Sequence, residues 1–162
     1  MQKNYAEKIT KYLIENHLTI SFMESCTSGL LASMFTDTEG ASSVFSGSLI
    51  TYSNDIKIKF GVDPLVIDKY GVYSSMCAEE MAKCVKKTFM TDIAIGITGT
   101  TGNVDPNNVD SVKGEAYFCV IFKDNVYDYH ISKDTKEMKR KDIKQCYADE
   151  VYKELLLLLP VE

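Results

Sequence analysis

The chain contains 162 residues, of which 45% are hydrophobic and 25% are charged, and this size and composition predict one globular domain with a sizeable core, not a disordered or fibrous protein. The 18 Lys and Arg residues and 23 Asp and Glu residues leave a net charge of −5, which argues against direct contact with nucleic acid or an anionic membrane, because both need a concentrated positive field. Arg140 is the only arginine in the sequence, so one side chain is available for a bidentate bond to a phosphate or carboxylate.

The first half of the chain alternates predicted helices and strands. Apolar residues at helical spacing predict a helix over 3–16, and a short apolar run predicts a buried strand over 18–23. We expect a second helix over 27–35 and a strand over 45–53. Short helical turns are expected over 55–70, because glycine and proline interrupt that segment.

The second half is predicted to hold a helix, three strands and a closing helix, with a long loop after its first strand. The expected ranges are helix 74–89, strand 92–98, loop 99–113, hairpin strands 114–122 and 125–132, and helix 135–159. Strands that alternate with helices, followed by one hairpin, predict an α/β fold. We therefore expect a single three-layer α/β/α domain over 1–162 with a mixed, mostly parallel sheet.

The cysteines and the apolar runs indicate the compartment. Five cysteines form an odd number without a C-x-x-C pair, which disfavours a disulfide framework and a zinc site. The first residues lack the apolar core of a signal peptide, and no apolar run approaches the ~20 residues of a membrane helix. We expect free thiols, no membrane contact and a cytoplasmic location.

A polar segment follows the first predicted strand. Its residues are Glu24-Ser25-Cys26-Thr27-Ser28-Gly29. A turn from strand to helix exposes a nucleophile and leaves helix N-terminal amides free to hold an anion or a developing oxyanion. The alternative is an ordinary helix cap, which the spacing alone favours, because Ser and Thr are common at that position.

A second polar segment, Thr98-Gly99-Thr100-Thr101-Gly102, follows the strand predicted over 92–98. If this strand and the first are parallel neighbours, both loops leave the sheet at its carboxyl edge, where α/β proteins bind ligands. Neither loop matches G-x-x-x-x-G-K-[ST] or G-x-G-x-x-G, so P-loop and dinucleotide-binding functions lose support.

A nucleophile at Ser25 would need a base. The two histidines, His17 and His130, lie far from both loops in the sequence, so a Ser-His or Cys-His arrangement has little support. A lysine can serve if burial and neighbours lower its pKa, because the neutral amine must take the hydroxyl proton. Lys57 follows the second predicted strand, although taken alone it is typical of a surface lysine.

Five motifs occur together in order along the chain: ESCTSG at 24–29, YSNDIK at 52–57, GVYSSMCAEEMA at 71–82, TGTTG at 98–102 and the segment 136–140. With these motifs the chain resembles the CinA C-terminal domain family, the competence/damage-inducible proteins whose free-standing members are nicotinamide-mononucleotide amidases. The resemblance covers nearly the whole chain. The pairing of ESCT with YSNxxK is its most specific part.

The resemblance implies a metal-independent, cofactor-free amidohydrolase that converts nicotinamide mononucleotide to nicotinate mononucleotide and ammonia. It implies that Ser25 is the nucleophile and Lys57 its general base, with Tyr52 and Thr98 beside them. The residues implied in binding the mononucleotide substrate and its oxyanion are Cys26, Thr27, Ser28, Gly29, Gly99, Lys136 and Arg140.

The chain departs from the family pattern at three places. Ser28 stands where the family usually has a second glycine, and Thr98-Gly99-Thr100-Thr101-Gly102-Asn103 stands in place of a TGxAGP-like loop. Lys136 and Arg140 occupy the positions of two arginines four residues apart. Lysine keeps the charge of arginine but loses its bidentate geometry, so we expect altered recognition of the phosphate or base.

Two other functions remain open. A catalytically impaired family member would bind a mononucleotide without turnover and act as a binding or regulatory protein. A structural or interaction domain in DNA uptake or damage responses is suggested only by the family's name, and the acidic composition argues against direct DNA contact. Exposed sheet edges also lead us to expect a homo-oligomer.

Overall fold

A five-stranded mixed sheet in the order β2-β1-β3-β4-β5 forms the centre of the protein. The computed structural model describes residues 4–102, 104–109 and 111–161. β1 pairs in parallel with β2 and β3, whereas β3–β4 and β4–β5 are antiparallel, so β4 runs against the other four described strands. The strands are β1 Ile20–Glu24, β2 Phe45–Ile50, β3 Ile93–Gly99, β4 Glu115–Phe122 and β5 Asn125–Ser132.

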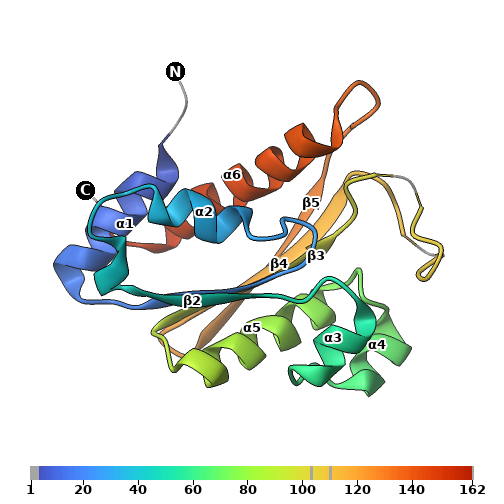
Figure 1. Cartoon of the computed structure of the whole chain (residues 1–162), viewed down its shortest axis with the longest axis horizontal. Coiled ribbons are helices and arrows are strands. Elements are labelled where there is room, and N and C mark those ends of the chain that lie inside the picture. The colour runs from blue at the N-terminus through green and yellow to red at the C-terminus, as the bar shows by residue number, and fades with distance from the viewer. Residues whose placement is uncertain (1–3, 103, 110, 162) are drawn as a thin grey trace.

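Helices cover both faces of this sheet (Figure 1), which confirms the predicted three-layer α/β/α architecture. One face carries α1 Tyr5–Asn16, α2 Leu30–Thr36 and α6 Arg140–Leu158, and the other carries α3 Asn54–Lys59, α4 Pro64–Tyr70 and α5 Ser75–Phe89. A 3₁₀ turn, η1 Ala41–Ser43, leads into β2. None of the helices in the described ranges is long and apolar enough to span a bilayer.

The core explains why β1 and β3 are mostly apolar, because every residue of both strands is buried. Phe22 packs edge-on against Phe35 of α2 and Tyr152 of α6 on one side of the sheet. On the other side, α5 lies so close to β3 that a Cβ at Gly96 would meet the Ala78 carbonyl oxygen at 2.4 Å. Glycine at this position is what permits the close packing.

Local interactions explain where the predicted helix 74–89 begins and where the predicted hairpin turns. Ser74 caps α5, since its side chain accepts a hydrogen bond from the Cys77 amide. The β4–β5 hairpin turns at Lys123 and Asp124, both of which have positive φ, the backbone that two-residue hairpin turns require.

Two predicted helix starts were wrong. α2 begins at Leu30 and not near Thr27, because Ser28 and Gly29 adopt left-handed backbone conformations with φ of 46° and 98°. α6 begins at Arg140 and not at residue 135. The Asp134 side chain accepts the Lys136 amide, a local bond that competes with helix formation.

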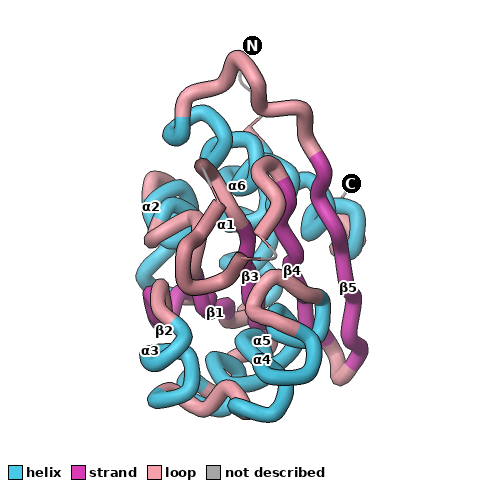
Figure 2. The backbone as a smooth tube through the Cα atoms, turned by 90° about the vertical axis from the view of Figure 1, so that its right-hand side faces the viewer, coloured by secondary structure: helices cyan, strands magenta, loops and turns pink. Residues whose placement is uncertain are grey.

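β2 also ends earlier than predicted, at Ile50 and not at residue 53. Ser53 instead serves as the extended N-cap of α3, and its hydroxyl accepts the Ile56 amide. The parallel strands β1, β2 and β3 therefore deliver three connections to one edge of the sheet, the edge that faces the viewer in Figure 2. These connections are residues 25–29, residues 51–53 and the segment after Gly99.

Candidate active site

Ser25 is the first residue after β1 and lies at the carboxyl edge of the sheet. Its amide donates to the Ile97 carbonyl of the neighbouring strand at 3.1 Å, and its own carbonyl accepts the Ser28 amide at 3.0 Å. The side chain is only 5% exposed, yet it lines a pocket of about 670 Å³. Backbone bonds on both sides thus hold the Ser25 hydroxyl at the base of a cavity.

Lys57 lies directly beside this hydroxyl. The residue belongs to the short helix α3 and is 2% exposed. Its Nζ lies 3.0 Å from Ser25 Oγ, 2.8 Å from the Thr51 carbonyl oxygen and 3.2 Å from the Tyr52 carbonyl oxygen. No carboxylate is among these three partners, so the amine is held entirely by neutral oxygens.

Burial lowers the pKa of Lys57, because desolvation disfavours the ammonium form. Negative charge at Cys77, Cys26 or Asp105 would act in the opposite direction. Burial, however, raises the pKa of Cys26 to about 12 and that of Cys77 to about 11, so both remain neutral thiols near pH 7. Asp105 is then the one charged group of the three.

The three oxygen partners also suit a neutral Lys57 amine. A neutral amine has two N–H donors and one lone pair. The Thr51 and Tyr52 carbonyls accept the two donors, which leaves the lone pair to face the Ser25 hydroxyl. This geometry lets Lys57 accept the Ser25 proton.

Glu24 organises the loop that carries Ser25, a role that the sequence reasoning missed. Its carboxylate is fully buried and accepts hydrogen bonds from the Thr27 hydroxyl at 2.8 Å and the Leu31 amide at 2.9 Å. It also accepts the Gly29 amide, the Ala32 amide and the Ser48 hydroxyl. A carboxylate at the start of α2 complements the helix dipole. The sequence feature that could have predicted this role is the acidic residue directly before Ser25.

Hydrogen bonds within the loop after β1 leave few backbone amides free to stabilise an oxyanion. The Ser28 amide donates to the Ser25 carbonyl and the Gly29 amide to Glu24. Both are therefore engaged, so the predicted contribution of residues 26–29 reduces to the amides of Cys26 and Thr27.

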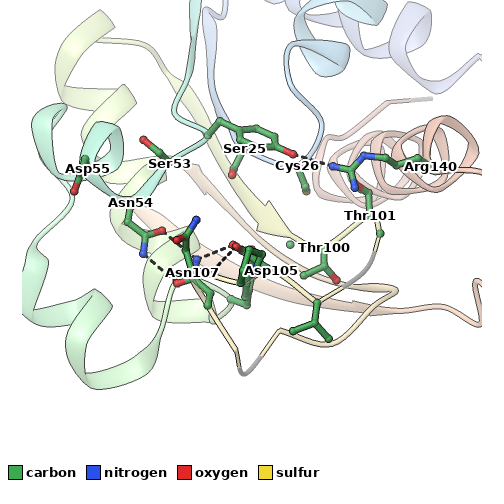
Figure 3. Close-up of a pocket in the computed structure, with 17 residues that line it drawn as sticks. Ser25, Cys26, Ser53, Asn54, Asp55, Thr100, Thr101, Asp105, Asn107 and Arg140 are labelled. Atoms are coloured by element: carbon green, nitrogen blue, oxygen red, sulfur yellow. Dashed lines mark hydrogen bonds between the residues drawn. The ribbon is translucent and has the colours of Figure 1, made fainter.

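Tyr52 and Arg140 both line the pocket, and Figure 3 shows Arg140 at one side of it. Arg140 is the first residue of α6, and its Nη2 donates to the Tyr52 hydroxyl at 2.8 Å. A Cβ at Gly102 would lie 2.4 Å from Arg140 Nη1. Glycine at position 102 thus leaves room for the guanidinium group at the pocket wall.

The opposite wall is the loop over 104–109, which is tied by hydrogen bonds to α3 and to the connection between α4 and α5. Asp105 accepts hydrogen bonds from the Tyr73 hydroxyl and the Asn108 amide nitrogen, both at 2.8 Å. Asn108 also accepts a hydrogen bond from Asn54 of α3 at 3.0 Å. The sequence reasoning treated this segment only as a loop and identified none of these residues.

The pocket lining includes five of the predicted site residues: Ser25, Cys26, Tyr52, Gly99 and Arg140. Lys57 is not part of the pocket lining, but its Nζ contacts Ser25 Oγ, which is.

Several predicted site residues have other contacts. The Thr98 hydroxyl donates to the Val72 carbonyl at 2.9 Å inside the protein. Ser28 bonds to Lys144 Nζ at 2.6 Å, and Thr27 bonds to Glu24. Lys136 is exposed in the turn before α6 and is not part of the pocket lining.

No cluster of three or more His, Cys, Asp or Glu side chains that could hold a metal ion occurs among residues 4–102, 104–109 and 111–161. All five cysteines are free.

The family model for the CinA C-terminal domain matches residues 2–159. The chain belongs to the CinA C-terminal domain family. Protein MG115 from Mycoplasma genitalium is 33% identical to this CinA domain over 156 residues, which are 96% of this chain and 97% of that protein. A CinA-like protein from Fervidobacterium nodosum is 42% identical over 101 residues, which are 62% of this chain and 25% of that protein. The match thus spans about a quarter of that longer relative.

Solved structures share the fold of this CinA domain. A competence-damaged protein (CinA) superfamily protein from Escherichia coli has a TM-score of 0.88 at 23% identity, covering 96% of this chain and 89% of that one. The competence/damage inducible protein CihA from Agrobacterium tumefaciens has a TM-score of 0.86 at 23% identity, covering 98% and 97%. These likenesses confirm the α/β fold.

Proposed function

We propose that this CinA domain is an amidohydrolase that deamidates nicotinamide mononucleotide to nicotinate mononucleotide and ammonia, with Ser25 as nucleophile and Lys57 as general base. The observation that carries the proposal is the 3.0 Å separation of Lys57 Nζ and Ser25 Oγ, with two carbonyl oxygens on the remaining N–H positions of the amine. The substrate comes from the resemblance to the family. The pocket, at about 670 Å³, falls within the range of about 300–1,000 Å³ of small-molecule sites.

The first half of the reaction uses this pair to cleave the amide. Lys57 takes the proton from the Ser25 hydroxyl while Oγ bonds to the carboxamide carbon, which gives a tetrahedral intermediate with a negatively charged oxygen. The Cys26 and Thr27 amides are the donors closest in sequence that could stabilise this oxygen. The Lys57 ammonium then returns its proton to the departing nitrogen, ammonia leaves, and an ester to Ser25 remains.

The second half hydrolyses this ester. Lys57, again neutral, takes a proton from a water molecule that bonds to the ester carbon. Collapse of the second tetrahedral intermediate breaks the bond to Ser25 Oγ, which recovers the proton from Lys57. One water is consumed, and one ammonia and one carboxylic acid are formed.

Arg140 supports an anionic substrate. Its guanidinium projects from the start of α6 into the pocket wall, and planar guanidinium groups match phosphate geometry. Lys136 does not join it there, so we assign the phosphate to Arg140 alone.

Binding without turnover is the second candidate function. The observation that favours it is the position of Lys136 outside the pocket lining, which leaves one of the two expected cationic positions unused. Such a protein would still be stabilised by a mononucleotide, since a ligand that binds only the folded state raises the melting temperature.

Ammonia release from nicotinamide mononucleotide by the purified protein tests the proposal. We expect turnover by the wild type and none by Ser25→Ala, with Ser132→Ala, at an exposed position at the end of β5, as the serine control. A wild type that is stabilised by the nucleotide but releases no ammonia would support the second candidate. A wild type that neither binds nor releases ammonia would contradict both.

A further inference from the structure

The pocket carries opposite charges on its two walls. Arg140 projects from α6 on one side, and Asp105 lies on the loop that forms the other (Figure 3). Ser25 lines the same cavity. A ligand that reaches Ser25 is therefore exposed to a cation on one side and an anion on the other.

The negative charge of Asp105 is fixed by its surroundings. One carboxylate oxygen accepts the Tyr73 hydroxyl and the Asn108 side-chain amide, and the other accepts the Asn107 backbone amide at 2.9 Å. These hydrogen bonds hold the pKa of Asp105 below its usual range, and the bond from the Asn108 side chain has the largest effect. The carboxylate stays ionised at neutral pH, and Asn54 ties its loop to α3.

This carboxylate has no cationic partner within 4.0 Å among the residues that the structure describes. Its donors are a phenol and two amides, and they are all neutral. Lys57 lies close enough for its charge to affect Asp105, but the neutral amine that the reaction needs carries none. An ionised, half-buried carboxylate that faces a cavity without a counter-ion favours a cationic ligand group.

We propose that Asp105 is a specificity-determining residue that selects substrates with a positively charged aromatic ring. The inference rests on the proposed function and deepens it. A nicotinamide ring that is bonded to ribose through its nitrogen is a pyridinium cation, and the carboxamide is attached to that same ring. When the carboxamide carbon is at Ser25 Oγ, the ring charge lies inside the pocket, between Arg140 on the phosphate side and Asp105 on the ring side.

A different role for Asp105 must be separated from this one. Its charge could act through Lys57 by favouring the ammonium, in which case its removal would change turnover of every substrate alike. Selection of a cationic ring instead predicts that the effect of Asp105 depends on the charge of the ring.

Two ligands that differ in ring charge make the test. Nicotinamide mononucleotide has a cationic ring, and its 1,4-dihydro form has a neutral ring with the same ribose, phosphate and carboxamide. Both dissociation constants are measured by calorimetry in Ser25→Ala protein, which prevents turnover. Adding Asp105→Asn should weaken binding of the cationic ligand by about tenfold, a modest effect for one charge pair near a protein surface. Binding of the neutral-ring ligand should change less than about twofold.

Asp68→Asn is the matched control. Asp68 is an exposed carboxylate of α4, so its substitution changes the net charge equally at a position outside the pocket. We expect it to leave both dissociation constants unchanged. Equal weakening of both ligands by Asp105→Asn would overturn the proposal, as would weakening by Asp68→Asn of the same size.

Tyr73→Phe provides a second variant if Asp105→Asn loosens the loop. It removes one hydrogen bond to Asp105 but keeps the charge, so the preference for the cationic ring should persist. Loss of that preference in Tyr73→Phe would assign the effect to loop order and overturn the proposal. If the wild type releases ammonia from nicotinamide mononucleotide but Asp105→Asn weakens binding of both ligands equally, or of neither, only the Asp105 assignment fails. If the wild type releases no ammonia, the proposed function fails first.

Discussion

Lys57 Nζ lies 3.0 Å from Ser25 Oγ, although the two residues are 32 positions apart and sit on different elements. The contact forms because β1 and β2 are parallel neighbours, so the loop after β1 and the helix after β2 emerge at the same edge of the sheet. Burial of Lys57 then converts an ordinarily charged side chain into a candidate base.

The pH dependence of turnover should report Lys57. The neutral amine is the active form, so kcat/KM should rise with pH through an apparent pKa below the ordinary lysine value of 10.5. The titratable neighbours that affect this group are Cys26, Cys77 and Asp105. A kcat/KM that falls as the pH rises from about 6 to about 10 would contradict a lysine base that is active when neutral.

The same pKa shift affects stability with a defined sign. Lys57 binds its proton more weakly in the folded protein than in the unfolded chain, so the unfolded state carries more protons in the pH window between the lowered pKa and 10.5. The contribution of this group to the free energy of unfolding should therefore rise with pH across that window. Urea unfolding of wild type and Lys57→Met at two pH values inside it measures the difference, and an identical pH dependence in both proteins would contradict the burial of a titrating Lys57.

Glu24→Gln should destabilise the protein. The carboxylate accepts hydrogen bonds at both oxygens, and an amide would present N–H groups toward the Ala32 amide or the Ser48 hydroxyl. Breaking part of a buried charged network costs about 2–4 kcal/mol, which chemical denaturation can measure. Glu39→Gln, at an exposed position, is the control. A loss below about 0.5 kcal/mol, the size of an ordinary surface substitution, would argue against the capping role.

Arg140→Ala should raise KM by about tenfold and leave kcat nearly unchanged, because the guanidinium is assigned to binding and not to the chemical step. Tyr52→Phe removes only the hydroxyl that accepts the Arg140 bond. We expect it to have a smaller effect on KM. Steady-state kinetics with nicotinamide mononucleotide measure both, and an unchanged KM in Arg140→Ala would place Arg140 among the solvent-exposed cations of α6.

Much of the fold could be predicted because its signals are local. β1 and β3 are short, mostly apolar and fully buried, Ser74 is a standard helix cap, and the hairpin turn has its own two-residue signal. The helix starts failed where side chains compete with the backbone. Asp134 holds the Lys136 amide before α6, and the left-handed Ser28 is held by Lys144 from a distant helix.

The site could be predicted only in part, because its chemistry depends on contacts between distant segments. The sequence places Lys57 at a strand end, but nothing local shows that two carbonyl oxygens and a serine enclose its amine. Asp105 is equally hidden, because its hydrogen bonds join the loop to Tyr73, 32 positions earlier. Sequence patterns identify which types of residue could take part in the site. Which of these residues contact one another is determined by the sheet topology.

The comparison of Lys57→Ala with Lys59→Ala tests the central claim most directly. Both lysines lie on α3, but Lys57 is buried against Ser25 and Lys59 is exposed. The comparison therefore separates the effect of removing the proposed base from the effect of removing any lysine of this helix. Loss of a general base that activates a serine lowers kcat by at least about 1,000-fold. In Lys57→Ala we expect the rate of ammonia release from nicotinamide mononucleotide to fall by this factor. In Lys59→Ala we expect the rate to change by less than about twofold. A Lys57→Ala protein that releases ammonia at the wild-type rate would contradict the account.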